Sequence, residues 1–265
     1  MYIESPQNSR IREWAKLKTK RGRDLDQAFL VEGMRLTKEV LESSLTVEQV
    51  LWDVGTDELP DSLLDRMRQR KVPLIEVSPA AFKVVSDTVT PQGVLAVVKI
   101  PEIHPVSEEA FAGAAHTLLL DGLQDPGNVG TLLRSAEAFG LDSVWMGTGT
   151  VDPYSPKVVR ASMGGLFRLR VASVDSVKLI LSWKERFPSG QVVVTAADGS
   201  LPCDAADLTK PCLFVLGSEA FGVSDAVVEL ADIRLRIPMT GLADSLNVAI
   251  AGSVLLYESL RQRRI

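Results

Sequence analysis

The sequence predicts an α/β protein whose second half folds around a parallel β-sheet. Three observations favour this class. Short apolar runs alternate with helical patterns along both halves, Gly- and Asn-rich loops follow the apolar runs of the second half, and a proline- and charge-rich stretch near residues 100–114 separates the halves. Strands that alternate with helices imply a parallel sheet covered on both faces. Because 265 residues exceed the usual size of a single core, we expect two domains, residues 1–106 and 107–265.

The first half is predicted to alternate strands and helices. Strands are expected at residues 29–32, 47–52, 72–77 and 93–99. Helices are expected after Gly33 and at residues 59–70 and 79–85. Proline suits the start of the last of these, because its fixed φ is already helical and its missing N–H is not needed in a first turn.

The second half repeats strand, polar loop and helix several times. We expect strands at residues 117–123, 143–146, 191–196, 212–217 and 233–237. An apolar stripe predicts a helix that ends at Gly140. The last helix is predicted to run from 245 to 264, with inward-facing side chains at Leu246, Ala249, Ile250, Val254 and Tyr257. Its broad apolar surface would suit a helix shared between the core and a dimer interface.

Composition and cysteine content exclude several classes of protein. With 46% hydrophobic and 24% charged residues, the chain resembles neither a disordered nor a collagenous protein nor a coiled coil. Cys203 and Cys212 lack the spacing of a zinc site or a disulfide framework, which favours a reduced, cytoplasmic compartment and no metal. The apolar runs are far shorter than the roughly 20 residues that span a bilayer, and the first ten residues show no secretory signal, so we expect no membrane partner.

Charge is distributed unevenly along the chain. The total is −5, yet residues 1–23 carry seven basic and two acidic side chains, a net +5 that leaves −10 elsewhere. The basic residues are Arg10, Arg12, Lys16, Lys18, Lys20, Arg21 and Arg23. A basic arm on an acidic body is expected where one end of a protein meets a polyanion such as RNA. The near-helical spacing of Ile11, Trp14 and Leu17 is typical of a solvated amphipathic helix, and this segment alone favours that interpretation over RNA binding.

The polar loops of the second half are the candidate ligand site. In an open parallel sheet, ligands bind outside the carboxyl ends of the strands. Neither a GxGxxG motif nor a P-loop is present, and the Gly127–Gly130 turn, with Asn128 as a helix cap, is the plain explanation of the nearest match. A serine hydrolase or metal site is poorly supported, because His104 and His116 both lie near the predicted linker with no paired ligand, and His116 stands at the beginning of a strand. What remains is an amide- and Gly-rich site, which suits a substrate that brings its own reactivity, such as a sulfonium methyl donor.

Three spaced motifs resemble a known family. The stretches DGLQDPGNVGTLLRSAEAFG, FVLGSEAFGVS and IRLRIPMTGLADSLNVAIAGSVLLYE are similar, in order and spacing, to the three motifs of the SpoU or TrmH family of RNA 2′-O-ribose methyltransferases in the SPOUT superfamily. SPKVVRASMGGLFRLRV resembles the family's linking segment. In the first half, FLVEGMRLTKEVL and SDTVTPQGVLAVV resemble the RNA-binding domain often fused ahead of the catalytic one.

The resemblance implies a fold, a cofactor and partners. The fold is a catalytic parallel-sheet domain with a deep trefoil knot, a rare exception to the rule against knotted chains, preceded by a smaller α/β domain similar to ribosomal protein L7Ae. The implied partners are RNA and a second copy of the chain, bound through the knotted domain. The implied S-adenosylmethionine site comprises Thr195, Ala196, Ala197, Leu216, Gly217, Ile237, Pro238, Met239 and Leu246.

The resemblance also implies an active site. Asn128, Arg134, Glu219, Ser245 and Asn247 match the family's polar positions. The family assigns activation of the ribose 2′-hydroxyl to Arg134, although a guanidinium with a pKa above about 12 is better suited to clamp a phosphate than to act as a base. Ser245 is expected to cap the last helix, and Arg160 is a candidate phosphate contact. Ala220 stands where relatives often have glycine, a small change that should preserve the loop.

Three hypotheses follow. The first is an RNA ribose 2′-O-methyltransferase, with 23S ribosomal RNA favoured over tRNA because the first domain resembles ribosomal-RNA-binding modules. The second is a non-catalytic RNA-binding protein that keeps the fold, which the intact set of polar residues argues against. The third is an unrelated nucleotide-binding α/β enzyme, which binding of a nicotinamide dinucleotide would support.

Overall fold

The computed structural model describes residues 1–103, 115–196, 198–241 and 245–264, which form two compact units. Unit 1 comprises Met1–Glu102 together with Tyr154–Phe167. Unit 2 comprises Ile103–Pro153 and Arg168–Ile265. The segment 154–167 belongs to unit 1 although it follows unit 2 strands in sequence, so a single boundary near residue 106 does not describe how the chain divides.

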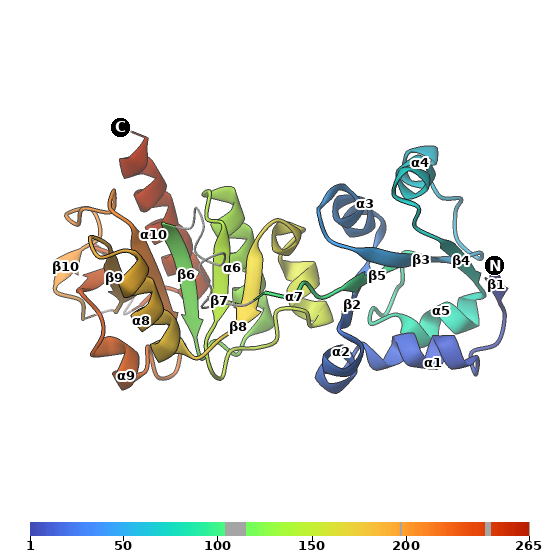
Figure 1. Ribbon diagram of the computed structural model, residues 1–265, viewed down its shortest axis with the longest axis horizontal. Coiled ribbons are helices and arrows are strands. Elements are labelled where there is room, and N and C mark those ends of the chain that lie inside the picture. Colours follow the sequence, from blue (N-terminus) through green and yellow to red (C-terminus); the bar gives the residue numbers. More distant parts are fainter. Residues whose placement is uncertain (104–114, 197, 242–244, 265) are drawn as a thin grey trace. The chain divides into compact units, whose positions relative to one another are not determined.

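Unit 1 is a five-stranded mixed sheet with helices on both faces (Figure 1). The strand order is β1-β4-β3-β5-β2, in which β5 runs antiparallel to β2 and β3. The strands are β1 (Tyr2–Ile3), β2 (Ala28–Glu32), β3 (Val47–Asp53), β4 (Leu74–Val77) and β5 (Val94–Lys99). The helices are α1 (Ser9–Lys16), α2 (Lys20–Asp26), α3 (Met34–Glu42), α4 (Asp61–Arg70), α5 (Pro79–Val85) and, from the later segment, α7 (Pro156–Ala161), followed by a 3-10 turn at Gly165–Phe167.

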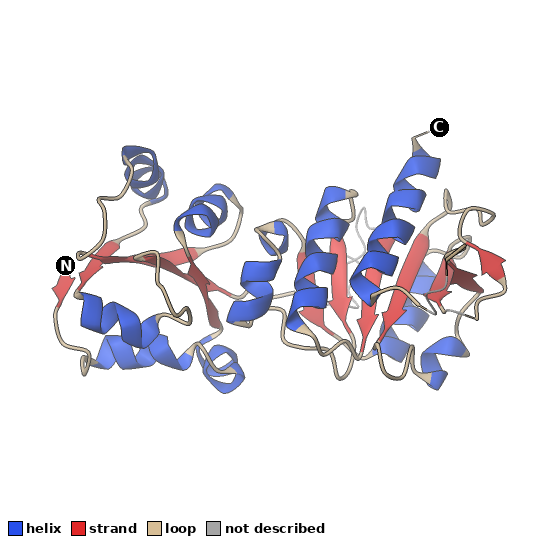
Figure 2. Cartoon of the chain, turned by 180° about the vertical axis from the view of Figure 1, so that it is seen from behind, coloured by secondary structure: helices blue, strands red, loops and turns tan. Residues whose placement is uncertain are grey.

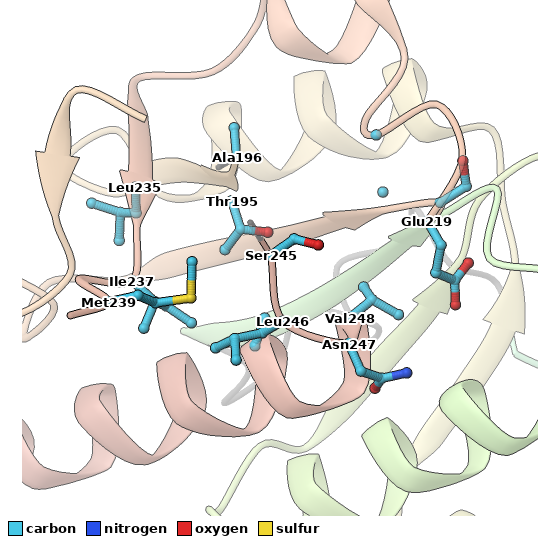
Figure 3. A pocket seen from close by; sticks show the side chains of 14 residues that line it. Thr195, Ala196, Glu219, Leu235, Ile237, Met239, Ser245, Leu246, Asn247 and Val248 are labelled. Atoms are coloured by element: carbon cyan, nitrogen blue, oxygen red, sulfur yellow. The ribbon is translucent and has the colours of Figure 1, made fainter. Parts of the chain in front are cut away.

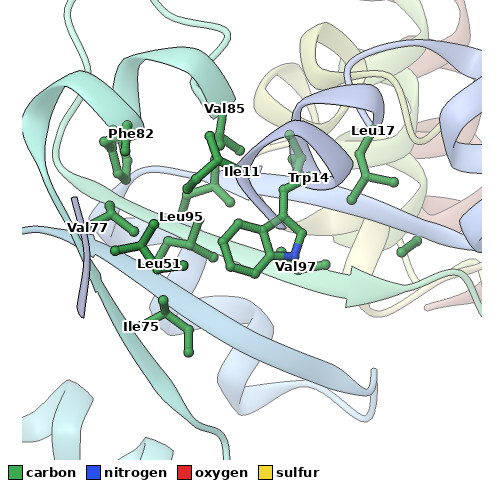
Figure 4. Close-up of a cluster of buried hydrophobic side chains, with 14 residues drawn as sticks. Ile11, Trp14, Leu17, Leu51, Ile75, Val77, Phe82, Val85, Leu95 and Val97 are labelled. Carbon is green, nitrogen blue, oxygen red and sulfur yellow. The ribbon is translucent and has the colours of Figure 1, made fainter. Parts of the chain in front are cut away.

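The basic N-terminal segment is built into the core of unit 1. Ile11, Trp14 and Leu17 are buried against Phe82 and Val85 of α5 and the apolar face of the sheet (Figure 4). Their spacing places all three on one side of the helical segment, as the amphipathic interpretation of the sequence expected. The segment is therefore a packed helix with a charged outer face.

Unit 2 is an all-parallel seven-stranded sheet, and the sequence predicted the parallel arrangement and five of the strands but not β8 or β10. The strand order is β10-β12-β9-β11-β6-β7-β8. Helices α6 and α10 cover one face, and α8 and α9 cover the other (Figure 2). The strands are β6 (His116–Asp121), β7 (Ser143–Met146), β8 (Arg170–Ser173), β9 (Gln191–Thr195), β10 (Leu201–Pro202), β11 (Cys212–Gly217) and β12 (Ile233–Arg236). The helices are α6 (Pro126–Ala138), α8 (Ser176–Arg186), α9 (Asp225–Val228) and α10 (Val248–Arg263).

The predicted inward face of the last helix was wrong in part. Helix α10 buries Ala249, Gly252, Leu255, Leu256 and Ser259, whereas Ile250, Val254 and Tyr257 are 54%, 39% and 54% exposed. The reason is a close approach at Gly252, where a Cβ atom would lie 2.5 Å from side-chain carbons of Leu132 and Leu216. The glycine side of α10 therefore faces α6 and β11, and an apolar row remains exposed.

No helix within the described ranges has both the length and the apolar character required to cross a membrane.

Candidate active site

A pocket of about 410 Å³ opens at the carboxyl ends of β9, β11 and β12, where ligands of open parallel sheets bind (Figure 3). Its walls come from residues 195–196 at the end of β9, residues 217–222 after β11, residues 235–239 at the end of β12 and residues 245–251 at the start of α10. The lining residues are Thr195, Ala196, Gly217, Ser218, Glu219, Gly222, Leu235, Ile237, Met239, Ser245, Leu246, Asn247, Val248 and Ala251.

This pocket gathers most of the residues expected to bind a cofactor. Six of the nine line it, namely Thr195, Ala196, Gly217, Ile237, Met239 and Leu246. Leu216 is fully buried beside Gly252 of α10. Pro238 is exposed and does not line the pocket, and Ala197 lies outside the described residues. The pocket volume falls within the range of about 300–1,000 Å³ that is usual for small-molecule sites, and its aliphatic walls are typical of such sites.

Five further lining residues were not singled out from the sequence. Leu235 lies two positions before Ile237, and alternate residues of a strand share a face, so the strand period could have identified it. Ser218 and Gly222 close the loop after β11 through two mutual backbone hydrogen bonds of 2.9 Å. Val248 and Ala251 belong to the first turn of α10 and could only be found once the start of that helix was known.

Three polar side chains from separate elements form a hydrogen-bonded chain at one end of the pocket. The Nδ2 atom of Asn128, in the first turn of α6, donates to Oε1 of Glu219, and Nδ2 of Asn247 donates to Oδ1 of Asn128 at 3.0 Å. Oδ1 of Asn247 accepts from the backbone N–H groups of Ala249 and Ile250 at 2.9 and 3.3 Å. Figure 3 shows Glu219 and Asn247 at the end of the pocket away from Ile237 and Met239. Each amide is thus fixed on both sides.

Two predicted helix caps were wrong. The N-cap of α6 is Asp125, whose Oδ1 accepts from the Asn128 N–H at 2.8 Å, and the N-cap of α10 is Asn247 in place of Ser245. Both differences arise because the helices begin two or three residues away from where the sequence pattern placed them. As a result, the Asn128 amide contacts Glu219, and Ser245 lines the pocket.

Arg134 lies outside the pocket of its own chain. Helix α6 packs through Val129, Leu132, Leu133 and Ala136, and Arg134 is on its exposed side. Among the described residues, its guanidinium has no hydrogen-bond or ion-pair partner. Six residues along a helix correspond to a rise of about 9 Å, so Arg134 lies about that far along the helix axis from Asn128.

The predicted RNA-binding basic residues divide into two groups. Arg23 is 3% exposed and its Nη1 donates to the Leu17 carbonyl at 2.8 Å, so this guanidinium is structural and its predicted RNA contact is withdrawn. Lys18 donates to the Val84 and Ser86 carbonyls at 2.6 and 3.3 Å, and the Arg10 guanidinium stacks 5.0 Å from the Trp14 ring centroid. Four remain on the exposed surface: Arg12, Lys16, Lys20 and Arg21.

Arg160 lies in unit 1. Its Nη2 atom is 2.9 Å from Oδ2 of Asp87 in an ion pair within that unit. The Arg160 side chain is about one-third exposed. It is therefore less exposed than the free surface charge that its sequence context suggested.

Neither cysteine supplies a nucleophile. Cys203 and Cys212 are both free and buried, and burial raises the pKa of Cys212 to about 11. A thiol with such a pKa is protonated near neutral pH, and the thiolate is the reactive form. No cluster of three potential metal ligands exists within the described part of the chain. The pocket is thus equipped to bind and orient reactants.

Two family models match the chain. Residues 115–257 match the SpoU rRNA Methylase family. Residues 8–96 match the MRM3-like substrate binding domain.

Relatives resemble the chain over nearly its whole length. The "23S rRNA (guanosine(2553)-2′-O)-methyltransferase RlmP" of Bacillus subtilis is 34% identical over 96% of this chain and 97% of its own. The "23S rRNA (uridine(2479)-2′-O)-methyltransferase" of Streptomyces viridochromogenes is 34% identical over 97% of this chain and 91% of its own. The solved structure of the SpoU methyltransferase AviRb from S. viridochromogenes, in complex with the cofactor AdoMet, superposes with a TM-score of 0.86 at 31% identity, covering 97% of this chain and 99% of that one.

Proposed function

Because the chain belongs to the SpoU rRNA methylase family, we propose that it transfers a methyl group from S-adenosylmethionine to a ribose 2′-hydroxyl of RNA. The substrate is 23S ribosomal RNA, since the similar curated relatives carry that substrate in their names. The observation that carries the proposal is the 410 Å³ pocket with the Asn128–Glu219–Asn247 chain at one end. It combines a small-molecule site with fixed polar groups at the carboxyl edge of the sheet.

The pocket fits S-adenosylmethionine in shape and chemistry. Ile237, Met239 and Leu246 provide aliphatic surface for the adenine ring, and the backbone of Thr195–Ala196 provides N–H and C=O groups at the ring edge. Gly217 keeps the wall at β11 free of any side chain. When bound, S-adenosylmethionine supplies a methyl carbon that its sulfonium already makes electrophilic, so the chain needs to position the attacking oxygen in line with it.

The polar residues position the RNA. Glu219 uses one carboxylate oxygen to accept from Asn128, which leaves its second oxygen to accept a hydrogen bond from the ribose 2′-hydroxyl. Asn128 and Asn247 hold that carboxylate in place. Arg134, one and a half to two turns further along α6, binds the phosphodiester next to the target ribose as a charged fork. Ser245 contributes its hydroxyl to the same end of the site.

Calorimetric titration of the purified chain tests this proposal. We expect S-adenosylmethionine to bind with a micromolar dissociation constant and NAD⁺ to give no heat of binding under the same conditions. Absence of S-adenosylmethionine binding would favour a non-catalytic RNA-binding protein, and NAD⁺ binding would favour an unrelated nucleotide-binding enzyme. Either result contradicts the proposal.

Three finer features complete the proposal. Unit 2 carries the deep trefoil knot of the family, and unit 1 is an RNA-binding domain related to ribosomal protein L7Ae. The mixed five-stranded sheet with helices on both faces supports the second assignment. The protein acts in the cytoplasm, where its two free, buried cysteines meet reducing conditions.

We also propose that unit 2 forms a homodimer through α10. Ile250, Val254 and Tyr257 form an exposed apolar row at positions i, i+4 and i+7 of one helix face. Such a row is typical of a helix covered by a second copy. The double variant Ile250→Glu/Tyr257→Glu should change the mass measured by light scattering from dimer to monomer.

A matched control is available on the opposite helical layer of the same unit. Leu181 of α8 is 48% exposed, so Leu181→Glu places one of the two added negative charges away from the proposed interface and should leave the dimer intact. A wild-type chain that is monomeric, or a double variant that stays dimeric, would contradict this interface.

The exposed basic residues of α1 and α2 are proposed to contact RNA phosphates. Replacing Lys16, Lys20 and Arg21 together with glutamine should weaken ribosomal RNA binding. The slope of log K against log salt concentration should decrease by about 2 to 3, because each phosphate contact accounts for roughly one unit. S-adenosylmethionine affinity should stay unchanged, because the pocket belongs to unit 2.

Helix α4 supplies the control for this experiment, because it covers the other face of the unit 1 sheet (Figure 1). Neutralising the exposed Arg66 and Arg68 of α4, together with its C-cap residue Lys71, removes the same number of charges. An equal decrease in slope for both triple variants would show that α1 and α2 contribute only through net charge.

A further inference from the structure

A second cavity, of about 280 Å³, lies within unit 1. Its walls come from the junction of β2 and α3, from the loop at residues 88–92, and from Arg160 and Met163 of the later segment 154–167. The volume is just below the range of about 300–1,000 Å³ typical of sites that enclose a whole small molecule. The cavity is therefore suited to a single flat group.

The later segment is firmly part of this unit. Tyr154 packs against Phe29 of β2 with ring centroids 4.9 Å apart. At Gly164, which has a φ of +92°, a Cβ atom would lie 2.4 Å from a carboxylate oxygen of Glu39 in α3. The absence of a side chain thus lets the segment approach α3 and places Met163 in the cavity wall.

Hydrogen bonds hold the other walls in a preformed arrangement. The carboxylate of Glu32 accepts from the Ser86 hydroxyl at 2.6 Å, the Asp87 N–H at 3.0 Å and the Thr88 hydroxyl at 2.5 Å. Oε1 of Gln92 accepts from the Met34 N–H at 3.1 Å. Glu32 and the Gln92 carbonyl are consequently engaged within the protein.

The remaining polar groups are mainly donors. The Arg160 Nη2 atom pairs with Asp87, but Nη1 is buried without a hydrogen-bond partner among the described residues. Arg160, Gln92 and the exposed Thr90 all line the cavity, and Gln92 Nε2 makes no hydrogen bond to the described residues. Leu36 and Met163 supply apolar surface. A complementary ligand has apolar faces and an edge that carries acceptors.

The local charge argues against a phosphate. Arg35 and Arg160 contribute two positive charges, and Glu32, Asp87 and Glu39 contribute three negative ones. The net negative charge around the cavity would repel a phosphodiester, which is itself negative. It would not repel a neutral base. Unpaired bases of RNA are commonly read at their edges while their faces stack on side chains.

We propose that this cavity binds an unstacked keto nucleobase of the RNA substrate, with the Arg160 guanidinium donating to a carbonyl oxygen of uracil or guanine. The inference rests on the proposed function, because it assigns a base-reading role to the substrate-binding unit of an RNA methyltransferase. It also replaces the phosphate contact first expected of Arg160. Chain segments from both halves of the sequence build the recognition site.

Binding of the full chain to single-stranded U10 and C10, labelled with fluorescein and followed by anisotropy, tests the proposal. Uracil offers O4 where cytosine offers an amino donor, so wild type should bind U10 about tenfold more tightly than C10. Arg160→Lys keeps a charge for Asp87 but removes the planar guanidinium with its several donors, and should reduce this ratio to about one. Thr90→Val, at an exposed position, should reduce it partly and does not threaten the fold.

The control is Arg66→Lys, since Arg66 is also an arginine paired with an acidic residue of unit 1 but lies outside the cavity. It should keep the wild-type ratio. Equal affinities of wild type for U10 and C10 would overturn the inference, as would an equal loss of both affinities in Arg160→Lys, which marks a phosphate contact. If the chain methylates ribosomal RNA but binds U10 and C10 equally, only this inference is refuted. If it binds U10 more tightly than C10 but does not methylate RNA, only the proposed function is refuted.

Discussion

Gly217→Ala is expected to weaken S-adenosylmethionine binding by about 100-fold. A Cβ atom at this position would lie 2.0 Å from the backbone carbon of Gly222 and 2.1 Å from the backbone nitrogen of Val223. Neither backbone atom can move without displacing the loop after β11, which the two Ser218–Gly222 hydrogen bonds close. That loop forms one wall of the pocket and carries Glu219. Calorimetry measures the loss of affinity directly.

Gly241→Ala is the matched control, because a Cβ atom there meets no atom within 4 Å. It should bind S-adenosylmethionine like wild type. If Gly217→Ala proves too unstable to purify, Met239→Glu introduces a charge at a half-exposed lining position without a packing demand and should also lower the affinity. Wild-type affinity in both pocket variants would mean that the cofactor binds elsewhere.

Arg134→Ala is expected to lower the single-turnover rate of methyl transfer by about 10²–10³, the usual effect of removing one charged group that stabilises a transition state. S-adenosylmethionine affinity should not change, because Arg134 does not line the pocket. Transfer of a radiolabelled methyl group to ribosomal RNA, with enzyme in excess, measures the chemical step separately from product release.

Arg134→Lys distinguishes a phosphate clamp from other roles. Lysine keeps the charge but loses the bidentate fork, so a clamp should retain part of the activity. Arg186, in the last turn of α8, is the control, and Arg186→Ala should keep the wild-type rate. Full activity of Arg134→Ala would remove Arg134 from the mechanism.

Elements with strong local signals could be predicted from the sequence. The bounds of β7, β11 and α5 agree with the prediction, because two are short, mainly apolar runs and the third begins at a proline. The inward face of α10 could not be chosen in the same way. Both sides of this helix are apolar, and periodicity does not tell which side meets the protein. The useful signal was Gly252, a residue without a side chain at the closest contact.

The position of the site was predictable, but its internal contacts were not. Loops at the carboxyl ends of parallel strands must share one edge of the sheet, and this places the residues of the three motifs around one pocket. Asn128 is hydrogen-bonded to Glu219 and Asn247, which lie 91 and 119 positions away from it in the sequence. These contacts therefore depend on the folded arrangement. Likewise, nothing local in the segment 154–167 indicates that it packs within unit 1.

The central claim, that this chain methylates a ribose 2′-hydroxyl of 23S ribosomal RNA, is tested most directly by a map of 2′-O-methyl positions in total RNA. The comparison is between cells that carry the intact gene, cells without it, and cells that carry Arg134→Ala. We expect one 23S position to be methylated only with the intact gene. An identical map in all three strains would contradict the account.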